Sequence, residues 1–548
     1  MAAHEEETQS SWFYKSGLVL AGACYLVSAF YVNFFGASGS SLSLGGERVL
    51  TVAHWQLEDG FREGLDEAFR EFEKIQAQRG VKVRVLQSTV PARGYPQWFL
   101  TQMIGGNPAD IIELSGSSAL HYRYFTPLSP YIGKPNPYNE GTPLEGMTWK
   151  DSYLDGMESS LDPVYAEYYG VGLGFFTYRL HVNLELLEKI TGSAKMPTDL
   201  KEWLDICQQV KGYSDRVGEP ISAIGVRGFD RGTLSSLLSY YYSQMNGNLN
   251  DYESGLCDGK AGQSDILAGV RDGRIPLERL TAVAGIVRDL GQYFMDGFTA
   301  IDLEQAKYMF YTGKVVFFPE GSWNTYSLVR NSRFKVGIVP LPVIGNHPVY
   351  GKYYTGKIAE TGARIGCKFG IPKASRNFPL ALELWQFVTS YRQNQAVMDR
   401  CKWLPGVKHA EFRGILESCK PEMEGNLSVA NPLLSSNRSS SGRKQFECLE
   451  SIIIEHAADA EARFLQSFND NKEQLREELT EVITNGYRAN FEREMKRSQI
   501  SLGLQRERIQ PEEKDRLQLM TTLGEESYAE NIHSLAGNRM YIRELNDM

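Results

Sequence analysis

The chain has 548 residues, of which 42% are hydrophobic and 23% are charged. This is the composition of an ordinary globular protein, and the length is enough for about two to four compact units with a sizeable buried core. The formal net charge of −9 gives no support to a nucleic-acid partner, which would need a basic face.

The N-terminal segment is the one strongly non-globular part of the sequence. Residues 17–35 read GLVLAGACYLVSAFYVNFF without a charge. A helix of this length, at about 1.5 Å per residue, is close to the thickness of a bilayer core. We expect residues 1–16 to remain cytoplasmic, residues 17–35 to form a transmembrane anchor, and the Gly/Ser-rich residues 36–47 to form a flexible linker.

Two alternatives to an uncleaved anchor stay open. A cleaved signal peptide has a basic start, whereas this start carries Glu5, Glu6 and Glu7. A lipoprotein signal would end at Cys24, which follows small residues, although the apolar run continues beyond that cysteine. In each case the rest of the chain is expected at the periplasmic face of the inner membrane or at the cell surface.

From residue 48 onward, strand and helix patterns alternate, which is typical of an α/β protein with mainly parallel sheets. Ligands of such folds gather at the carboxyl ends of the strands. The first predicted elements are the strands 48–55, 81–86 and 109–114, and between them the helices 58–78 and 95–104.

The middle of the chain continues the pattern. Residues 169–178 look like an extended crossing strand, and Thr198 is a plausible N-cap for the helix that follows it. Further apolar periodicity predicts helices around 280–294 and 381–391. Two short strands are expected between these helices, at 314–318 and 334–339.

The last hundred residues have a different character. From about Gln445 to Gln510 there is no proline, and apolar residues recur every three or four positions. We therefore predict that residues 446–548 form a helical C-terminal extension. Its main apolar stripe comprises Leu475, Leu479, Val482, Ile483, Tyr487, Phe491 and Met495.

The sequence carries no signature of the common hydrolases, metalloproteases, nucleotidases or kinases. Its histidines are scattered, and its cysteines show no CxxC or metal-ligand spacing. We therefore predict no catalytic residue, metal or cofactor. Carboxylates are plentiful, so a carbohydrate-active hydrolase that uses two of them remains an alternative.

A set of segments in a fixed order resembles the extracellular solute-binding proteins of ABC transporters, in the large family that includes maltodextrin and other sugar receptors. The resemblance extends from about residue 48 to about residue 405. The segments that carry it are GNPADIIEL at 106–114, YGVGLGFFTYRLHVN at 169–183, PTDLKEWL at 197–204, MFYTGKVVFFPEGSW at 309–323, FKVGIVPLP at 334–342, IPKAS at 371–375 and KWLP at 402–405.

This resemblance implies a two-lobed periplasmic-binding-protein fold of type II over residues 48–445, in which hinge closure traps a ligand. The expected boundaries place 48–170 and 313–365 in the first lobe, and 171–312 and 366–445 in the second. The implied function is capture of a small molecule, most simply a carbohydrate, for an ABC permease in the membrane. The uncleaved anchor and the C-terminal extension also fit a membrane-anchored sensor that feeds a signalling partner.

Sugars present hydroxyl edges and apolar C–H faces, so their receptors combine aromatic platforms with fixed polar groups. Trp323 follows a strand and matches the cleft tryptophan of the family, with core packing as the alternative. Asp230 could equally cap a helix. The remaining candidates are His54, Trp55, Glu113, Ser115 and Ser117 at strand ends, Phe176 on the crossing strand, and Arg227, Phe229 and Trp403 in the second lobe.

Overall fold

The fold is known from a computed structural model. The expected anchor at 17–35, the linker and Cys24 lie outside the residues that the structure describes. Within the described ranges, no helix combines the length and the apolar character that crossing a bilayer requires. The described residues are 47–162, 165, 167–252, 261–360, 365–436, 439–504 and 510–547.

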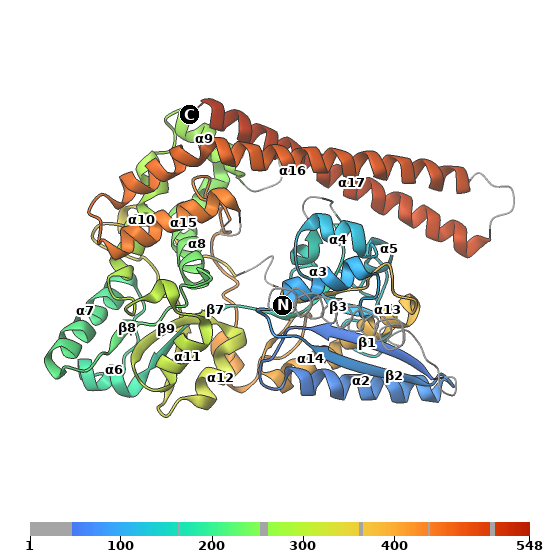
Figure 1. The fold of residues 1–548 in the computed structure, drawn as a ribbon, viewed down its shortest axis with the longest axis horizontal. Helices are drawn as coiled ribbons and strands as arrows, with labels where there is room; N and C mark the ends of the chain where they lie inside the picture. Colours follow the sequence, from blue (N-terminus) through green and yellow to red (C-terminus); the bar gives the residue numbers. More distant parts are fainter. Residues whose placement is uncertain are drawn as a thin grey trace, which may run out of the picture. The chain divides into compact units, whose positions relative to one another are not determined.

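The chain folds into two compact units, whose elements are labelled in Figure 1. The described residues of the first unit are 47–57, 65–126 and 369–388, and the second unit contains the others. The first unit is therefore built from segments that are far apart in the sequence.

The first unit contains a parallel sheet. Strand β1 (Arg48–His54) pairs in parallel with β2 (Val83–Thr89) on one side and with β3 (Ile111–Glu113) on the other. On its other side, β3 pairs in antiparallel fashion with the end of β11 (Ile365–Gly370). The predicted parallel arrangement of the first three strands is confirmed, and their carboxyl ends meet at one edge of the sheet.

Helices connect and complete these strands. The sheet buries residues such as Leu50, Val52 and Ile111, which explains why the strands read as apolar runs. The helices are α2 (Phe61–Gln78), which begins in the second unit, α3 (Tyr95–Gly105), α4 (Ser118–Tyr124) and α13 (Phe378–Val388).

The second unit contains a mixed sheet with the order β10–β7–β9–β8. Strand β7 (Tyr178–Asn183) is antiparallel to β10 (Val336–Pro340) and to β9 (Val315–Gly321), whereas β8 (Ser222–Ile224) is parallel to β9. As a result, the carboxyl ends of β8, β9 and β10 lie at the same edge as the beginning of β7. We call this the Trp323 edge, because Trp323 follows β9 directly.

These pairings differ from the lobe boundaries expected from the sequence. Residues 315–321, expected in the first lobe, pair with β7 and β8 in the second unit. Residues 369–388, expected in the second lobe, belong to the unit that contains β1, β2 and β3. The sequence pattern indicates where a strand lies but not which strand it pairs with. For this reason, each of these two segments was assigned to the wrong unit.

The other elements of the second unit are short strands and helices. Strand β6 (Val171–Phe175) pairs with β12 (Leu404–Pro405), and β4 (Leu161–Asp162) pairs with β5 (Glu167–Tyr168). The helices of this part of the chain are α5 (Ser129–Ile132), α6 (Leu184–Thr191), α7 (Leu200–Val217), α8 (Gly232–Asn246), α9 (Gln263–Arg271), α10 (Leu277–Gly291), α11 (Leu303–Tyr311), α12 (Thr325–Asn331) and α14 (Tyr391–Cys401).

Helix α7 begins one residue later than the sequence indicated. Its N-cap is Asp199, whose side-chain oxygen accepts a hydrogen bond of 2.9 Å from the backbone N–H of Glu202. Thr198, the expected cap, instead donates its hydroxyl to the carboxylate of Glu202. An aspartate satisfies the free N–H groups of a first helical turn as well as a threonine does.

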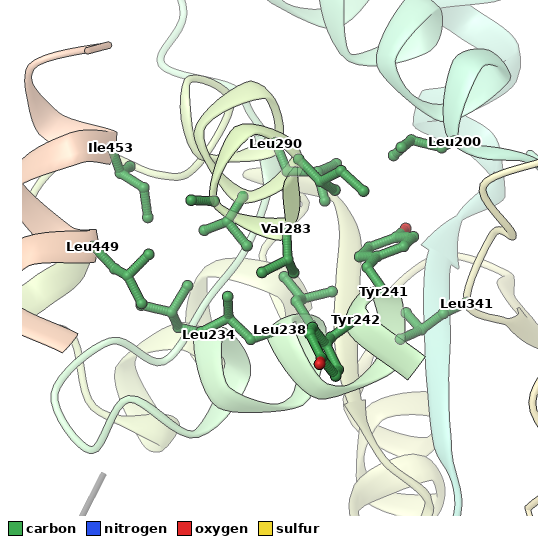
Figure 2. Close-up of a cluster of buried hydrophobic side chains, with 14 of the residues drawn as sticks. Leu200, Leu234, Leu238, Tyr241, Tyr242, Val283, Leu290, Leu341, Leu449 and Ile453 are labelled. Carbon is green, nitrogen blue, oxygen red and sulfur yellow. The ribbon is translucent and has the colours of Figure 1, made fainter. Parts of the chain in front are cut away.

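Helices α8 and α10 form the centre of the hydrophobic core of the second unit (Figure 2). Leu234 and Leu238 of α8 face Val283 of α10, and Leu449 of α15 points into the same cluster. Almost every residue from Leu280 to Leu290 in α10 is buried. A helix that is apolar on all sides must be covered on all sides.

The C-terminal extension supplies part of that cover. It consists of α15 (Ser440–Ile454), α16 (Ala460–Leu504) and α17 (Pro511–Asp547), which confirms the predicted helices and places their start slightly earlier. Gly291 of α10 allows a close approach, because a Cβ atom there would lie 2.5 Å from the side chain of Ile453. The first part of the extension therefore belongs to the core.

Helices α16 and α17 lie side by side (Figure 1). Their contact includes Gly486, where a Cβ atom would meet Leu535 at 2.5 Å. The predicted apolar stripe on α16 is buried only in part. Leu475 and Ile483 are enclosed, whereas Phe491 is 69% exposed and Met495 is 53% exposed.

Candidate functional site

Trp323 stands at the carboxyl end of β9, in the short 3-10 turn Ser322–Asn324. Its ring is half-buried and folds back over Gly321, where a Cβ atom would lie 2.2 Å from the ring. Glycine at this position therefore leaves the space that the indole occupies. The indole of Trp323 is partly exposed and is held in a fixed position. An aromatic ring that stacks on a ligand needs both properties.

Two further aromatic residues hold this tryptophan in place. The ring of Phe176 contacts Trp323 edge-to-face with centroids 5.4 Å apart, and it contacts Trp403 in the same manner at 5.1 Å. The indole N–H of Trp403 donates a hydrogen bond of 3.1 Å to the backbone oxygen of Trp323. The structure thus brings together three predicted residues, and we call Phe176, Trp323 and Trp403 the aromatic cluster.

The members of the cluster differ in exposure. Trp403 is buried and packs on Phe61 with ring centroids 4.9 Å apart, so its role is to support its neighbours. Phe176 is half-buried, like Trp323. Within the aromatic cluster, Phe176 and Trp323 are therefore the two members that can offer an aromatic surface to a ligand.

Charged groups occupy the same edge, because β8 is parallel to β9 and ends beside it. Arg227, just after β8, has its Nε atom 3.5 Å from Oε2 of Glu320, the residue before Gly321. Within the described part of the chain, neither of these two atoms has a hydrogen-bond partner. They form a buried ion pair at 3.5 Å, and among the described residues a full hydrogen bond is made by neither of these two atoms.

The carboxyl group of Glu320 is fully buried. Burial raises its pKa, because desolvation disfavours the charged form, and the guanidinium of Arg227 opposes this effect. Glu320 was not among the residues chosen from the sequence. Its signal was a carboxylate at the end of an apolar strand, three residues before the candidate tryptophan.

The two other candidates of this loop have different surroundings. Asp230 lies 3.4 Å from Arg227, and it accepts a 2.9 Å hydrogen bond from the N–H of Gly232, the first residue of α8. Asp230 therefore binds the N-terminus of α8 and also belongs to the charged group around Arg227. Phe229 is 64% exposed, and its ring contributes nothing to the aromatic cluster as the structure stands.

In the first unit, His54 and Glu113 are fully buried at the ends of β1 and β3. His54 contacts the Gln87 side-chain oxygen at 2.6 Å and accepts from the N–H of Gln56 at 3.1 Å. Glu113 accepts from the N–H of Trp55 at 3.3 Å and from the side chain of Gln56. These two side chains hold the loop after β1 in place and present no surface of their own.

Trp55, the aromatic residue of this loop, is half-buried. Its ring contacts Tyr95 at 4.7 Å, and Tyr95 contacts Trp98 at 5.3 Å. Tyr95 and Trp98, on α3, were missed because their helix was predicted only as a connection. Among the two serines, Ser115 is half-buried with its backbone oxygen bonded to His121, and Ser117 is exposed just before α4.

No group of three or more His, Cys, Asp or Glu side chains among the described residues is arranged to hold a metal ion. The Trp323 edge presents aromatic faces, a buried ion pair and one exposed carboxylate. Aromatic faces suit the apolar faces of a ligand, and the polar groups beside them suit its hydroxyl groups.

The chain has clear relatives in structure. A sequence profile of the bacterial extracellular solute-binding proteins matches residues 54–395. A search of curated protein sequences finds no significant match. This chain belongs to the bacterial extracellular solute-binding protein family, which confirms the resemblance noted from the sequence.

Three solved structures illustrate the shared fold. A chitin oligosaccharide binding protein is 14% identical, with a TM-score of 0.52 over 78% of this chain and 99% of its own. The GacH receptor of Streptomyces glaucescens is 15% identical, with a TM-score of 0.52 over 77% and 97%. The maltose-bound MalE3 of T. maritima is 18% identical, with a TM-score of 0.50 over 77% and 98%. At these identities the likeness establishes the α/β fold.

Proposed function

We propose that this protein captures a carbohydrate outside the cytoplasm and delivers it to an ABC-type permease, without catalysing a reaction. The observation that carries the proposal is the half-buried Trp323, fixed by Phe176 and Trp403 at the carboxyl end of β9. An indole held in this way offers a rigid apolar face to the C–H groups of a sugar ring.

Polar groups beside this face suit the rest of a sugar. The part-exposed guanidinium of Arg227 can donate to hydroxyl groups, and the exposed carboxylate of Asp230 can accept from them. Glu320 and Asp230 outnumber the single Arg227 in this group. A neutral polyol is therefore a better ligand here than an anion.

The first unit supports the same interpretation by itself. It presents Trp55 at the carboxyl end of a parallel strand, where ligands of α/β folds bind, and the buried His54 and Glu113 fix the loop that carries it. We propose Trp55 as a ligand-contacting residue of the first unit. We also propose residues 17–35 as the membrane anchor, or Cys24 as a lipid attachment point.

The test is fluorescence titration of the purified chain with maltose, acarbose, chitin oligosaccharides and galactose. The choice follows the ligands named for the related structures and extends it to a monosaccharide. We expect saturable quenching by at least one sugar. Trp323→Ala should lower the affinity for that sugar by at least about tenfold, the loss expected for a central aromatic contact.

Two variants make the result specific. Trp323→Phe keeps an aromatic face and should retain most of the affinity, whereas Phe491→Ala removes an exposed aromatic ring of α16 and should change nothing. A folded chain that binds none of these sugars, or an unchanged affinity in Trp323→Ala, contradicts the proposal. Turnover of a glycan that depends on one carboxylate would instead establish the hydrolase alternative.

The exposed stripe on α16 favours a second use of the same binding site. Phe491 and Met495 are apolar side chains in solvent, as surfaces for protein partners are. A sensor would use bound sugar to signal to a membrane partner. Affinity capture of the full chain from native membranes separates the two uses, because a permease is expected for transport and a signalling receptor for sensing.

A further inference from the structure

A cavity lies in the second unit, where the carboxyl end of β10 meets the beginning of β7. Its volume is about 610 Å³, within the range of roughly 300–1,000 Å³ that is usual for small-molecule sites. Its walls include Tyr178, Tyr240 and Tyr354, and its charged lining includes Asp199, Lys357 and Glu422. None of the aromatic cluster, and neither Arg227 nor Glu320, lines this cavity.

The three tyrosines give the cavity aromatic walls and hydrogen-bond acceptors. The hydroxyl of Tyr240 donates to the backbone oxygen of Leu341 at 2.6 Å, and the hydroxyl of Tyr178 donates to that of Pro319 at 3.0 Å. Because these two protons are already engaged, neither hydroxyl group can donate a hydrogen bond to a ligand. The walls therefore favour a ligand that donates hydrogen bonds.

Arg179 also lines the cavity but supplies no positive charge to a ligand. It is 1% exposed, and its two terminal nitrogens bind the carboxylate of Glu360 at 2.9 and 2.8 Å. Its other hydrogen bonds reach backbone oxygens of residues 178 and 418–420. Arg179 and Glu360 thus neutralise each other and close one side of the cavity.

The charges left over are two carboxylates against one ammonium group. Asp199 uses one carboxylate oxygen to cap α7, and Glu422 contributes a second carboxylate. Lys357 is exposed and is the one cation left among these lining residues. An anion would be repelled by this set, whereas a cation would gain from the carboxylates and from the tyrosine faces.

We propose that this cavity is a second binding site, separate from the sugar site, for a small organic cation: an amine or ammonium group on a short apolar body. The ammonium group lies between Asp199 and Glu422 and donates to acceptor oxygens. The apolar body lies against the tyrosine rings and against Val339, Leu341 and Val343.

The test compares 1,4-diaminobutane with 1,4-butanediol by isothermal titration calorimetry on the full chain at 0.15 M salt. The two probes have the same carbon chain and differ in charge. We expect saturable binding of the diamine with the diol at least about tenfold weaker, as charge-assisted contacts imply. Equal binding of the two probes, or no binding of the diamine by folded protein, overturns the proposal.

Two isosteric substitutions locate the site. Asp199→Asn keeps a good helix cap while removing the charge, and Glu422→Gln removes the second charge. Each substitution should lower the affinity for the diamine by about fivefold or more. Glu424→Gln is the matched control, since Glu424 is exposed and does not line the cavity, and it should have no effect.

The Trp323→Ala variant tests whether the diamine binds independently of the sugar site. It should leave the affinity for the diamine unchanged whatever it does to sugar binding, because Trp323 does not line the cavity. A diamine affinity that falls in Trp323→Ala or in Glu424→Gln, or that survives both Asp199→Asn and Glu422→Gln, contradicts the assignment.

Discussion

The indole of Trp323 occupies the space in which a side chain at residue 321 would begin. Gly321 has φ −70° and ψ 150°, a conformation that alanine adopts without strain, so Gly321→Ala should fold normally. Its Cβ atom would lie 2.2 Å from the ring and must displace it. We expect sugar affinity to fall by about tenfold, close to the effect of Trp323→Ala, in the same titration.

A matched substitution serves as the control for this prediction. Gly133 has φ −75° and no heavy atom near the position of a new Cβ atom, so Gly133→Ala should leave sugar affinity unchanged. Near-ultraviolet circular dichroism should report the displaced indole in Gly321→Ala alone. An unaltered affinity in Gly321→Ala would show that this ring does not contact the ligand.

His181, on β7, makes the stability of the protein depend on pH. It is fully buried, its Nδ1 lies 3.1 Å from the backbone oxygen of Phe318, and its Nε2 lies 2.8 Å from the Thr325 hydroxyl. Burial lowers the pKa of His181 from 6.5 to about 4. Between these values the unfolded chain binds a proton that the folded chain does not, so the free energy of unfolding falls as the pH drops from 6.5 towards 4.

This titration should cost about 3 kcal/mol across the window, at about 1.4 kcal/mol per pH unit. Urea denaturation at pH 7 and at pH 4.5 measures it. The His181→Gln variant should be less stable at pH 7 but should lose less additional stability at pH 4.5 than the unmodified chain. Equal losses in the two proteins would mean that His181 does not titrate in this range.

At the residue scale, the sequence predicted positions better than orientations. It located Trp55, Glu113 and Trp323 at the carboxyl ends of strands, and the structure has them there. It could not predict that Glu113 turns inward to accept the N–H of Trp55, because hydrogen bonds between residues distant in sequence leave no local pattern. Glu320 was overlooked because it reads as the last residue of an apolar strand.

At the scale of elements, two phenylalanines of the C-terminal extension provide a direct comparison. Phe446 of α15 is 1% exposed in the core, whereas Phe491 of α16 is 69% exposed. Phe446→Ala should lower the free energy of unfolding by about 3–5 kcal/mol, the usual cost of a large core truncation. Phe491→Ala should change it by less than about 0.5 kcal/mol.

Chemical denaturation with the two variants side by side checks this prediction. A small effect of Phe446→Ala would mean that α15 lies outside the core. The sequence alone, which indicated a simple C-terminal extension, implied such a position. The sequence did contain a contrary signal. Ala282, Ala284 and Ile286 add apolar positions on the other sides of α10, so this helix is apolar all round and needs further cover.

At the scale of the whole molecule, the sequence predicted the α/β class, the family and the order of the elements, but not the division of the chain. Consecutive strands and helices follow from local periodicity. The assignment of residues 315–321 and 369–388 to a unit depends on pairings with strands that are distant in sequence. Local patterns carry no information on such pairings.

The split of the first unit has a consequence for how the protein is made. Strand β3 is synthesised early, but its partner at Phe369–Gly370 emerges only after residues 127–368. At about 5–20 residues per second, the ribosome needs tens of seconds to produce that stretch. During this time the nascent sheet has an open edge, the kind of surface that invites aggregation. A chaperone that binds the chain during this interval would raise the yield of folded protein more than a substitution that stabilises the folded state.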